Sequence, residues 1–367
     1  MTRQAFVHRA PMRAPDDVSG MEALISAGVV DPSSVVAIFG KTEGNGCVND
    51  FSRGFAVRAL QDALGRNRPD GDGDSVNLVM SGGAEGALSP HMMIFEAREV
   101  AAPSEQGALA IGRARTPVLP FEGLGRFRQV DDVAQAVRVA MADAGLRSPC
   151  DVHFVQIKCP LLTADRVAEV EARGLTTATR DTLKSMSLSR AASALGVAVA
   201  LEEVGRDQIE ESSIGRDWSL YSACASASAG VELVDHEIVV LGSSDDWAGP
   251  LRIAHCVMQD AIDLDPVRGS LRGLGVAASG QLPPSERARI VALLAKAEAS
   301  STGEVRGYRH TMLNDSDISS TRHARAFVAG ALAGLIGHTQ IYVSGGAEHQ
   351  GPDGGGPVAI ITTRAPA

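Results

Sequence analysis

Runs of apolar and β-branched residues recur along the chain, and three of them end in a lysine. They read SVVAIFGK, DVHFVQIK and IVALLAK, and they end at Lys41, Lys158 and Lys296. Short apolar runs rich in Val and Ile are typical of buried strands. The pattern therefore predicts three strands that each carry a lysine at the end.

A stretch of small and apolar residues follows each of these strands, with the spacing of a close-packed helix. The three stretches are SRGFAVRAL, SRAASALGVAVA and ARAFVAGALAGLIG. Each opens at an arginine, namely Arg53, Arg190 or Arg325. We therefore expect three helices that begin at these arginines.

Each predicted helix is followed by a short run that reaches a serine. Ser81 follows NLVM and Ser344 follows IYV, and both open the same five letters, SGGAE. The middle of the chain, YSACASASAGVE, offers both Ser226 and Ser228. We favour Ser226, because it ends a run of small residues as Ser81 ends NLVM, and leave Ser228 open. The glycine-rich letters predict turns at the serines, and a strand-like run follows each: HMMIFEA, HEIVVLGSS and PVAIITTR.

The order strand, helix, serine turn, strand thus occurs three times, which indicates an internal repeat. The lysine-to-serine separations are 40, 68 and 48 residues, differences that surface loops tolerate. Polar stretches with Gly or Pro at 100–108 and 244–251 are predicted linkers. We predict an α/β fold of three tandem αβ units, 1–104, 112–250 and 256–367. A pseudo-threefold axis would relate them, with a central β-barrel-like core and helices outside.

Such an arrangement would gather three lysines, three arginines and three serines around one cavity. Serine needs an adjacent base to act as a nucleophile, and a lysine kept neutral by burial and neighbouring cations can serve. The middle unit has flanks unlike the other two, so Ser226 and Lys158 are the natural catalytic candidates. The other residues would bind substrate: Lys41, Lys296, Arg53, Arg190, Arg325, Ser81 and Ser344, with backbone N–H groups at Gly82, Gly345 and Ala227.

Composition narrows the class of partner. The 367 residues carry a net charge of −10, with no cluster of Lys and Arg, which disfavours nucleic acid and anionic membranes. No apolar run suits a membrane span or a signal peptide, so we expect a cytoplasmic protein that binds a small molecule. The five scattered cysteines favour reduced thiols.

Several long segments resemble the cyanuric acid hydrolase and barbiturase family. They are GKTEGNGCVNDFSR (40–53), VMSGGAEGALSPH (79–91), DVHFVQIKCPLLT (151–163), AKAEAS (295–300), RHTMLNDSDISSTRHAR (309–325) and YVSGGAEHQGPDGGGP (342–357). The resemblance implies three similar repeats, a homotetramer and hydrolytic opening of a cyclic imide. For cyanuric acid the product would be carboxybiuret, which loses carbon dioxide to give biuret. It also implies that the pair in the second repeat, assigned here as Ser226 and Lys158, is catalytic.

The resemblance leaves two other functions open. Barbiturase activity is the nearest, because barbituric acid differs from cyanuric acid by one ring group. A protein that binds a small ring without turning it over is more remote, since a binder needs no neutral base.

The glycine-rich loop GGAEHQGPDGGGP exposes carbonyl oxygens of the kind that hard cations prefer. The family resemblance implies a structural Mg²⁺ or Ca²⁺ here and no cofactor for the chemistry. The implied ligands are Glu298, Ala347, Gln350, Gly351, Pro352 and Gly355. A turn without a metal is the alternative reading.

Overall fold

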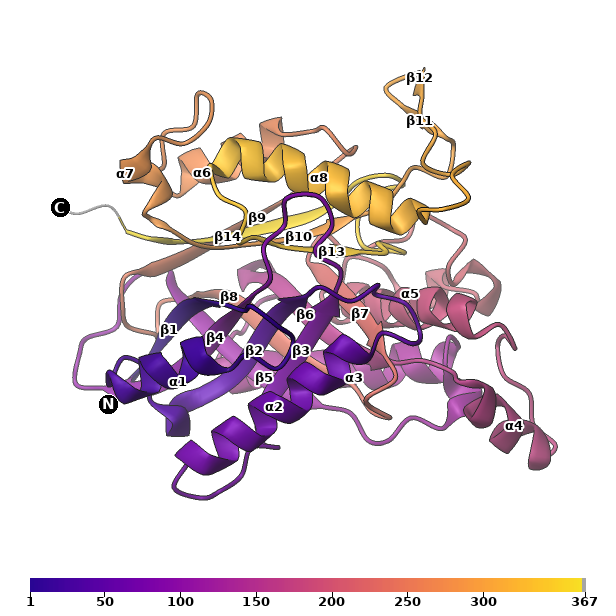
Figure 1. Ribbon diagram of the computed structural model, residues 1–367, viewed down its shortest axis with the longest axis horizontal. Helices are drawn as coiled ribbons and strands as arrows, with labels where there is room; N and C mark the ends of the chain where they lie inside the picture. Colours follow the sequence, from indigo (N-terminus) through magenta and orange to yellow (C-terminus); the bar gives the residue numbers. More distant parts are fainter. Residues whose placement is uncertain (365–367) are drawn as a thin grey trace.

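The computed structural model describes residues 1–364 and has a mixed α/β fold, in which three four-stranded sheets pack together with helices outside them (Figure 1). The first sheet contains β1 (Thr2–Pro11), β4 (His91–Val100), β2 (Val35–Thr42) and β3 (Asn77–Gly82), in that spatial order. The second contains β5 (Ala108–Arg115), β8 (Glu237–Ser244), β6 (Val152–Pro160) and β7 (Ala225–Gly230). The third contains β9 (Leu251–Met258), β14 (Gly356–Thr363), β10 (Ile290–Ala297) and β13 (Tyr342–Gly345).

The helices and short elements complete the described chain. The helices are α1 (Ser19–Ser26), α2 (Phe51–Asn67), α3 (Phe127–Ala144), α4 (Ala164–Ala172), α5 (Thr182–Ala200), α6 (Asp265–Gly273), α7 (Pro284–Arg287) and α8 (Ser320–Ile336). Five 3-10 turns span Pro32–Ser34, Phe121–Gly123, Pro149–Asp151, Arg206–Gln208 and Glu211–Ser213, and a small hairpin pairs β11 (Glu304–Val305) with β12 (Tyr308–Arg309).

All three sheets have the same internal order. Counted along the chain, the first strand pairs with the fourth, the fourth with the second, and the second with the third. The second and third strands are parallel in each sheet, and they are joined through α2, α5 or α8. Parallel neighbours need such a crossover, usually a helix. The lysine-bearing runs are therefore strands, as predicted: β2, β6 and β10.

The helix boundaries have local causes. Asp50 accepts a hydrogen bond from Ser52 N at the start of α2, and Asp181 accepts one from Lys184 N at the start of α5. Gly337 ends α8 with φ of 89°, a left-handed conformation that glycine adopts without strain. The prediction that each helix begins at its arginine was close for α2 and wrong for α5 and α8, where Arg190 and Arg325 lie inside the helix.

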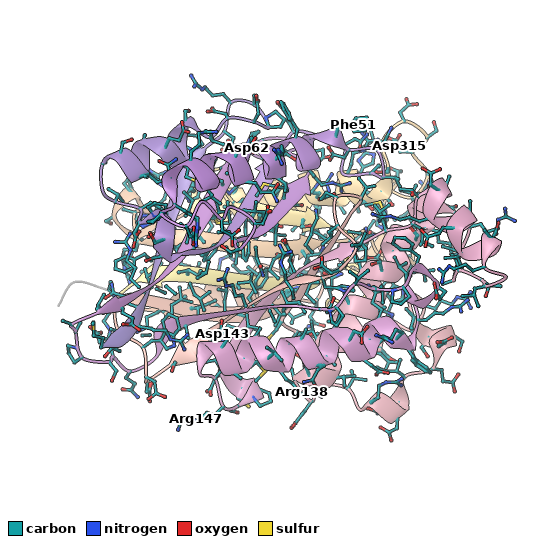
Figure 2. The ribbon with its side chains drawn as sticks, turned by 90° about the horizontal axis from the view of Figure 1, so that it is seen from below. Phe51, Asp62, Arg138, Asp143, Arg147 and Asp315 are labelled. Carbon is teal, nitrogen blue, oxygen red and sulfur yellow. The ribbon has the colours of Figure 1, made fainter. Side chains whose placement is uncertain are left out.

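The main hydrophobic core lies where the inner faces of the three sheets meet, and it contains Phe39, Phe154 and Leu294, all fully buried. Further clusters fill the space between the first sheet and α1 and α2, and between the third sheet and α6 and α8. In Figure 2 the labelled Asp62 of α2 and Arg138 of α3 point away from the sheets, and both are exposed. Because both faces of the sheets are covered, the central strands read as continuous apolar runs.

Two expectations need correction. The strands of residues 1–364 form separate sheets, and no closed barrel is found. The serines do not lie in turns: Ser81 and Ser344 are near the ends of β3 and β13, and Ser226 and Ser228 are both in β7.

No helix of the described chain is long and apolar enough to cross a membrane. All five cysteines are free.

Candidate functional site

The parallel strand pairs bring each lysine opposite a serine. Lys41 of β2 is in register with Ser81 of β3, and Lys296 of β10 with Ser344 of β13. In the second sheet, Lys158 of β6 is in register with Ser228 of β7. The serine that corresponds to Ser81 and Ser344 is therefore Ser228.

The choice of Ser226 as that serine was wrong. Ser226 stands opposite Gln156, to whose Oε1 it donates a hydrogen bond of 2.9 Å, and it is fully buried. The next residue is engaged as well, because Ala227 N donates to Gln350 Oε1 at 2.7 Å. The residue that matches Gly82 and Gly345 is consequently Ala229 rather than Ala227.

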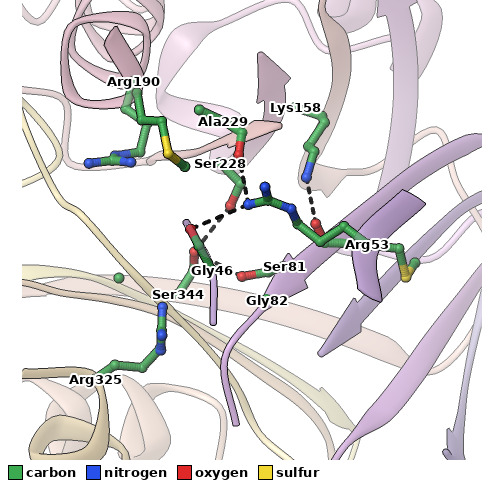
Figure 3. A pocket seen from close by; sticks show the side chains of 13 residues that line it. Gly46, Arg53, Ser81, Gly82, Lys158, Arg190, Ser228, Ala229, Arg325 and Ser344 are labelled. Carbon is green, nitrogen blue, oxygen red and sulfur yellow. Dashed lines mark hydrogen bonds between the residues drawn. The ribbon is translucent and has the colours of Figure 1, made fainter. Parts of the chain in front are cut away.

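The three serine hydroxyls meet at one point between the sheets (Figure 3). Ser81 Oγ donates to Ser344 Oγ at 3.2 Å, and the hydroxyls of Ser228 and Ser344 are 3.1 Å apart. They border a small cavity. Its lining comprises Gly46, Arg53, Met80, Ser81, Gly82, Lys158, Met186, Arg190, Ser228, Ala229, Arg325, Ser344 and Gly345.

Most of the predicted binding residues thus line one cavity, whereas Lys41, Lys296, Ser226 and Ala227 do not. Lys41 and Lys296 nevertheless contact the serines that do. Lys41 Nζ donates to Ser81 Oγ at 3.1 Å, and Lys296 Nζ donates to Ser344 Oγ at 3.3 Å. Lys158 differs: its Nζ donates to Met80 O at 2.6 Å and lies 2.7 Å from Glu232 Oε1.

The pKa of each lysine is below the ordinary value because all three ammonium groups are buried. The charge of Arg325 lowers the pKa of Lys41 further, and burial together with Arg190 lowers the pKa of Lys296 to about 7. For Lys158, burial lowers the pKa while the carboxylate of Glu232 partly offsets the effect. The site can therefore supply a neutral amine close to neutral pH.

Two of the three cavity arginines form two-point ion pairs. Arg190 donates from Nε and Nη2 to Glu348 at 2.8 and 2.6 Å, and Arg325 donates from the same two nitrogens to Glu85, each at 2.5 Å. Arg53 instead donates to backbone oxygens, with Nη1 3.1 Å from Ala229 O and Nη2 2.7 Å from Cys47 O. A guanidinium fixed in this way presents its remaining N–H groups in a defined direction.

The glutamates are site residues that the sequence reasoning missed. Glu85, Glu232 and Glu348 each stand four residues after a cavity serine, in SGGAE, SAGVE and SGGAE. This spacing was a readable signal, and it would have selected Ser228 over Ser226.

The second glycine of SGGAE is needed for the arginine to approach. Gly83 and Gly346 have φ of 101° and 79°, in the left-handed region. A Cβ at Gly83 would lie 2.0 Å from Arg325 Nη2, and one at Gly346 would lie 2.4 Å from Arg190 Nε. The glycines thus make room for the two ion pairs, a role different from the backbone donors predicted for their neighbours.

The residues predicted to hold a metal fit only in part. The carboxylate of Glu298 is buried, accepts from Ala299 N and Ala347 N at 3.0 and 3.1 Å, and forms no ion pair with a side chain of residues 1–364. Burial and the nearby charge of Glu348 raise its pKa to about 7. A buried acid beside a second acid is a donor set that suits a divalent cation.

The remaining ligands of that set are less clearly available. Gln350 Oε1 already accepts from Ala227 N, and the carbonyl oxygens of Ala347 and Pro352 accept from Gln350 N and Gly355 N within the loop. The described residues contain no group of three or more His, Cys, Asp or Glu side chains that could hold a metal.

Comparison with known proteins identifies the family of the chain. Residues 6–363 match the family model described as amidohydrolase ring-opening protein. The cyanuric acid amidohydrolases of Bradyrhizobium sp. (strain ORS 375) and of Azorhizobium caulinodans are each 62% identical to the chain, over 99% and 98% of its length and 98% of their own. A crystal structure of a cyanuric acid hydrolase from A. caulinodans superimposes with a TM-score of 0.92 at 62% identity, covering 99% of this chain and all of that one. A second cyanuric acid hydrolase structure gives 0.93 at 48% identity over the same shares. The chain belongs to the family of ring-opening amidohydrolases.

Proposed function

We propose that the chain opens the ring of cyanuric acid by hydrolysis, giving carboxybiuret, which loses carbon dioxide to form biuret. The observation that carries this proposal is the meeting of three serines, each from a different sheet, in one small cavity with three arginines. Cyanuric acid has three equivalent carbonyl groups, so three equivalent sets of donors suit it. The names of the relatives described above support the same substrate.

In the mechanism that we propose, Ser228 is the nucleophile and Lys158 the general base. Neutral Lys158 takes the proton of Ser228 Oγ, which attacks a ring carbonyl carbon. The C–N bond of the ring then breaks, and Lys158 returns the proton to the leaving nitrogen. The product remains bound to Ser228 as an ester until water, deprotonated by Lys158, releases it as carboxybiuret.

Several contacts support roles for the other residues in this scheme. Lys41–Ser81 and Lys296–Ser344 are hydrogen-bonded pairs whose serines border the cavity, so we assign them to the two ring carbonyls that do not react. The guanidinium groups of Arg53, Arg190 and Arg325 are buried and suited to carbonyl oxygens that gain negative charge. Gly82, Ala229 and Gly345 directly follow the three serines in the sequence, and we assign their N–H groups as backbone donors to the ring oxygens.

A pseudo-threefold relationship between the three sheets is part of the proposal. The shared strand order and the matching lysine–serine registers support it. We accordingly retain three units at 1–104, 112–250 and 256–367, of which residues 365–367 lie outside the described chain. A homotetramer is also proposed, from the family resemblance, and the cytoplasmic location stays a prediction from the sequence.

We also propose a structural divalent cation held by Glu298 and by backbone carbonyls of the loop at 347–355. It would neutralise the buried carboxylate and fix the loop that carries Glu348. The chemistry at Ser228 does not use it.

Turnover of cyanuric acid and barbituric acid, measured side by side with the purified protein, tests the proposed function. Loss of ring absorbance and release of carbon dioxide with cyanuric acid alone would support it. Opening of barbituric acid alone would make the chain a barbiturase, and tight binding of either ring without turnover would make it a binding protein.

A further inference from the structure

Two of the three glutamates that follow the cavity serines pair with a cavity arginine on the crossover helix of a different sheet, and the third does not. Glu85, after β3 of the first sheet, pairs with Arg325 of α8, and Glu348, after β13 of the third sheet, pairs with Arg190 of α5. By the same rule Glu232, after β7 of the second sheet, should pair with Arg53 of α2. It pairs with Lys158 instead, at 2.7 Å.

The atoms that would form the missing pair are both left without proper partners. In Arg190 and Arg325 the Nε atom donates to a glutamate, whereas Arg53 Nε is buried and has no hydrogen-bond partner among residues 1–364. Glu232 Oε1 lies within ion-pair distance of Lys158 Nζ, but the other carboxylate oxygen, Oε2, has no donor in the same range. A buried donor and a buried acceptor that remain unsatisfied are costly.

The backbone beside Glu232 differs in the corresponding place. Gly230 is the counterpart of Gly83 and Gly346 by its distance from the serine, but its φ is not positive. A Cβ at Gly230 would lie 2.3 Å from Glu232 Oε2, whereas at the other two glycines it would meet an arginine. The segment after Ser228 is therefore folded so that Glu232 turns back, and a glycine at 230 leaves the other backbone conformation accessible.

Glu232 also has room to move. It lines a second cavity together with Lys158, and none of the three cavity serines lines that second cavity. The charged and titratable groups around it are Lys158 on β6, Arg53 on α2, Arg166 on α4, Arg115 on β5, Asp235 in the loop before β8, and Glu237, the first residue of β8.

We propose that Glu232 is a positioning residue with two alternative partners. It pairs with Lys158 in the free enzyme and with Arg53 Nε once the ring is bound. At Lys158 it holds the ammonium group away from Ser228, since Nζ contacts Met80 O and Glu232 and not Ser228 Oγ. At Arg53 it would complete the third ion pair, fix that guanidinium on the substrate and release the lysine to act on Ser228. The inference rests on the proposed function, because the base that it controls is the one assigned there.

The pH dependence of kcat/KM and of kcat in Glu232→Gln tests whether Glu232 changes its partner when the ring binds. An adjacent carboxylate favours the charged form of a lysine, so its removal should lower the pKa of Lys158. The acidic limb of kcat/KM reports the free enzyme and should move down by about one to three pH units, a typical effect of a close charge. The limb of kcat reports the complex and should move much less, because Glu232 has then left Lys158. Ionisation of the substrate is common to both enzymes and cancels in the comparison.

Glu85→Gln is the matched control, because Glu85 has the same position in the first sheet but pairs with Arg325. It should raise KM while both limbs stay in place. Equal movement of both limbs in Glu232→Gln would mean that the carboxylate never leaves Lys158, and movement of neither would mean that it does not control the lysine. Either result overturns the proposal.

A crystal structure of Ser228→Ala with cyanuric acid bound provides a second measurement. We expect a Glu232 oxygen within hydrogen-bond distance of Arg53 Nε, and finding it still on Lys158 would contradict the proposal. The wild-type rate separates failure of the proposed function from failure of the role of Glu232. If the wild type opens no ring, the proposed function fails. The pKa of Lys158 is then measured by ¹⁵N NMR in wild type and in Glu232→Gln. A downward shift is still expected there, and its absence counts against Glu232.

Discussion

Arg190 and Glu348 join α5, which crosses over the second sheet, to the loop after β13 of the third sheet, through two hydrogen bonds of 2.8 and 2.6 Å. Both side chains are buried. Buried charges of this kind are tolerated because each compensates the other, so the pair holds one wall of the cavity in place.

Glu348→Gln should destabilise the protein by about 3–5 kcal/mol, because it leaves the buried charge of Arg190 uncompensated. Urea unfolding measures the free energy of unfolding. Arg147→Ala is the control, since its ion pair with Asp246 is exposed and such pairs contribute about 0–1 kcal/mol. Equal effects of the two substitutions would show that the buried pair is not important for stability.

Ser228→Ala should reduce kcat by at least about 10³-fold, which is the scale of nucleophile loss in Ser-based hydrolases. Ser226→Ala should retain most of the activity, because Ser226 Oγ is committed to Gln156 and does not reach the cavity. Steady-state rates with cyanuric acid, and a search by mass spectrometry for an ester on Ser228, are the measurements. Activity retained in Ser228→Ala would move the nucleophile to Ser81, which already receives a hydrogen bond from Lys41.

Gly83→Ala should raise KM and lower stability by about 1–3 kcal/mol, the cost of a non-glycine residue in a strained backbone conformation. The added Cβ would also push Arg325 away from Glu85. Gly54→Ala is the matched control: it lies in α2 with no atom within 4 Å of the new Cβ, and it should raise stability by about 0.5–1 kcal/mol. Thermal melting and KM for cyanuric acid check both variants, and unchanged values in Gly83→Ala would refute the role assigned to this glycine.

Removal of divalent cations with a chelator should lower the melting temperature, because Glu298 would lose the ion that neutralises it. Addition of Mg²⁺ or Ca²⁺ should restore it, and Glu298→Gln should no longer respond to either treatment. A wild-type melting temperature that ignores both chelator and cation would count against the metal.

Much of the fold was readable from the sequence because apolar runs of β2, β6 and β10 are buried on both faces, which leaves a strong signal. The position of the middle serine was harder to assign. Ser226 and Ser228 are two residues apart in β7, so both point to the same face of the sheet, and the alternation of the strand cannot distinguish them. Only the distance to Glu232 separates the two.

The contact between Lys158 and Glu232 could not be predicted from the repeat either. The repeated letters favour Arg53 as the partner of Glu232, and the choice between the two depends on the backbone conformation at Gly230. Glycine permits both backbone conformations, so the presence of a glycine at position 230 does not indicate which one is adopted.

The ion pairs of the cavity never join a glutamate to an arginine of its own sheet's crossover helix. Glu85 is paired with an arginine some 240 positions later in the chain, and Glu348 with one 158 positions earlier. A fragment that ends before the third sheet would therefore lack both the carboxylate that pairs with Arg190 and the guanidinium that pairs with Glu85. For this reason we expect the chain to unfold as a single cooperative unit, with no stable species in which one sheet has come away.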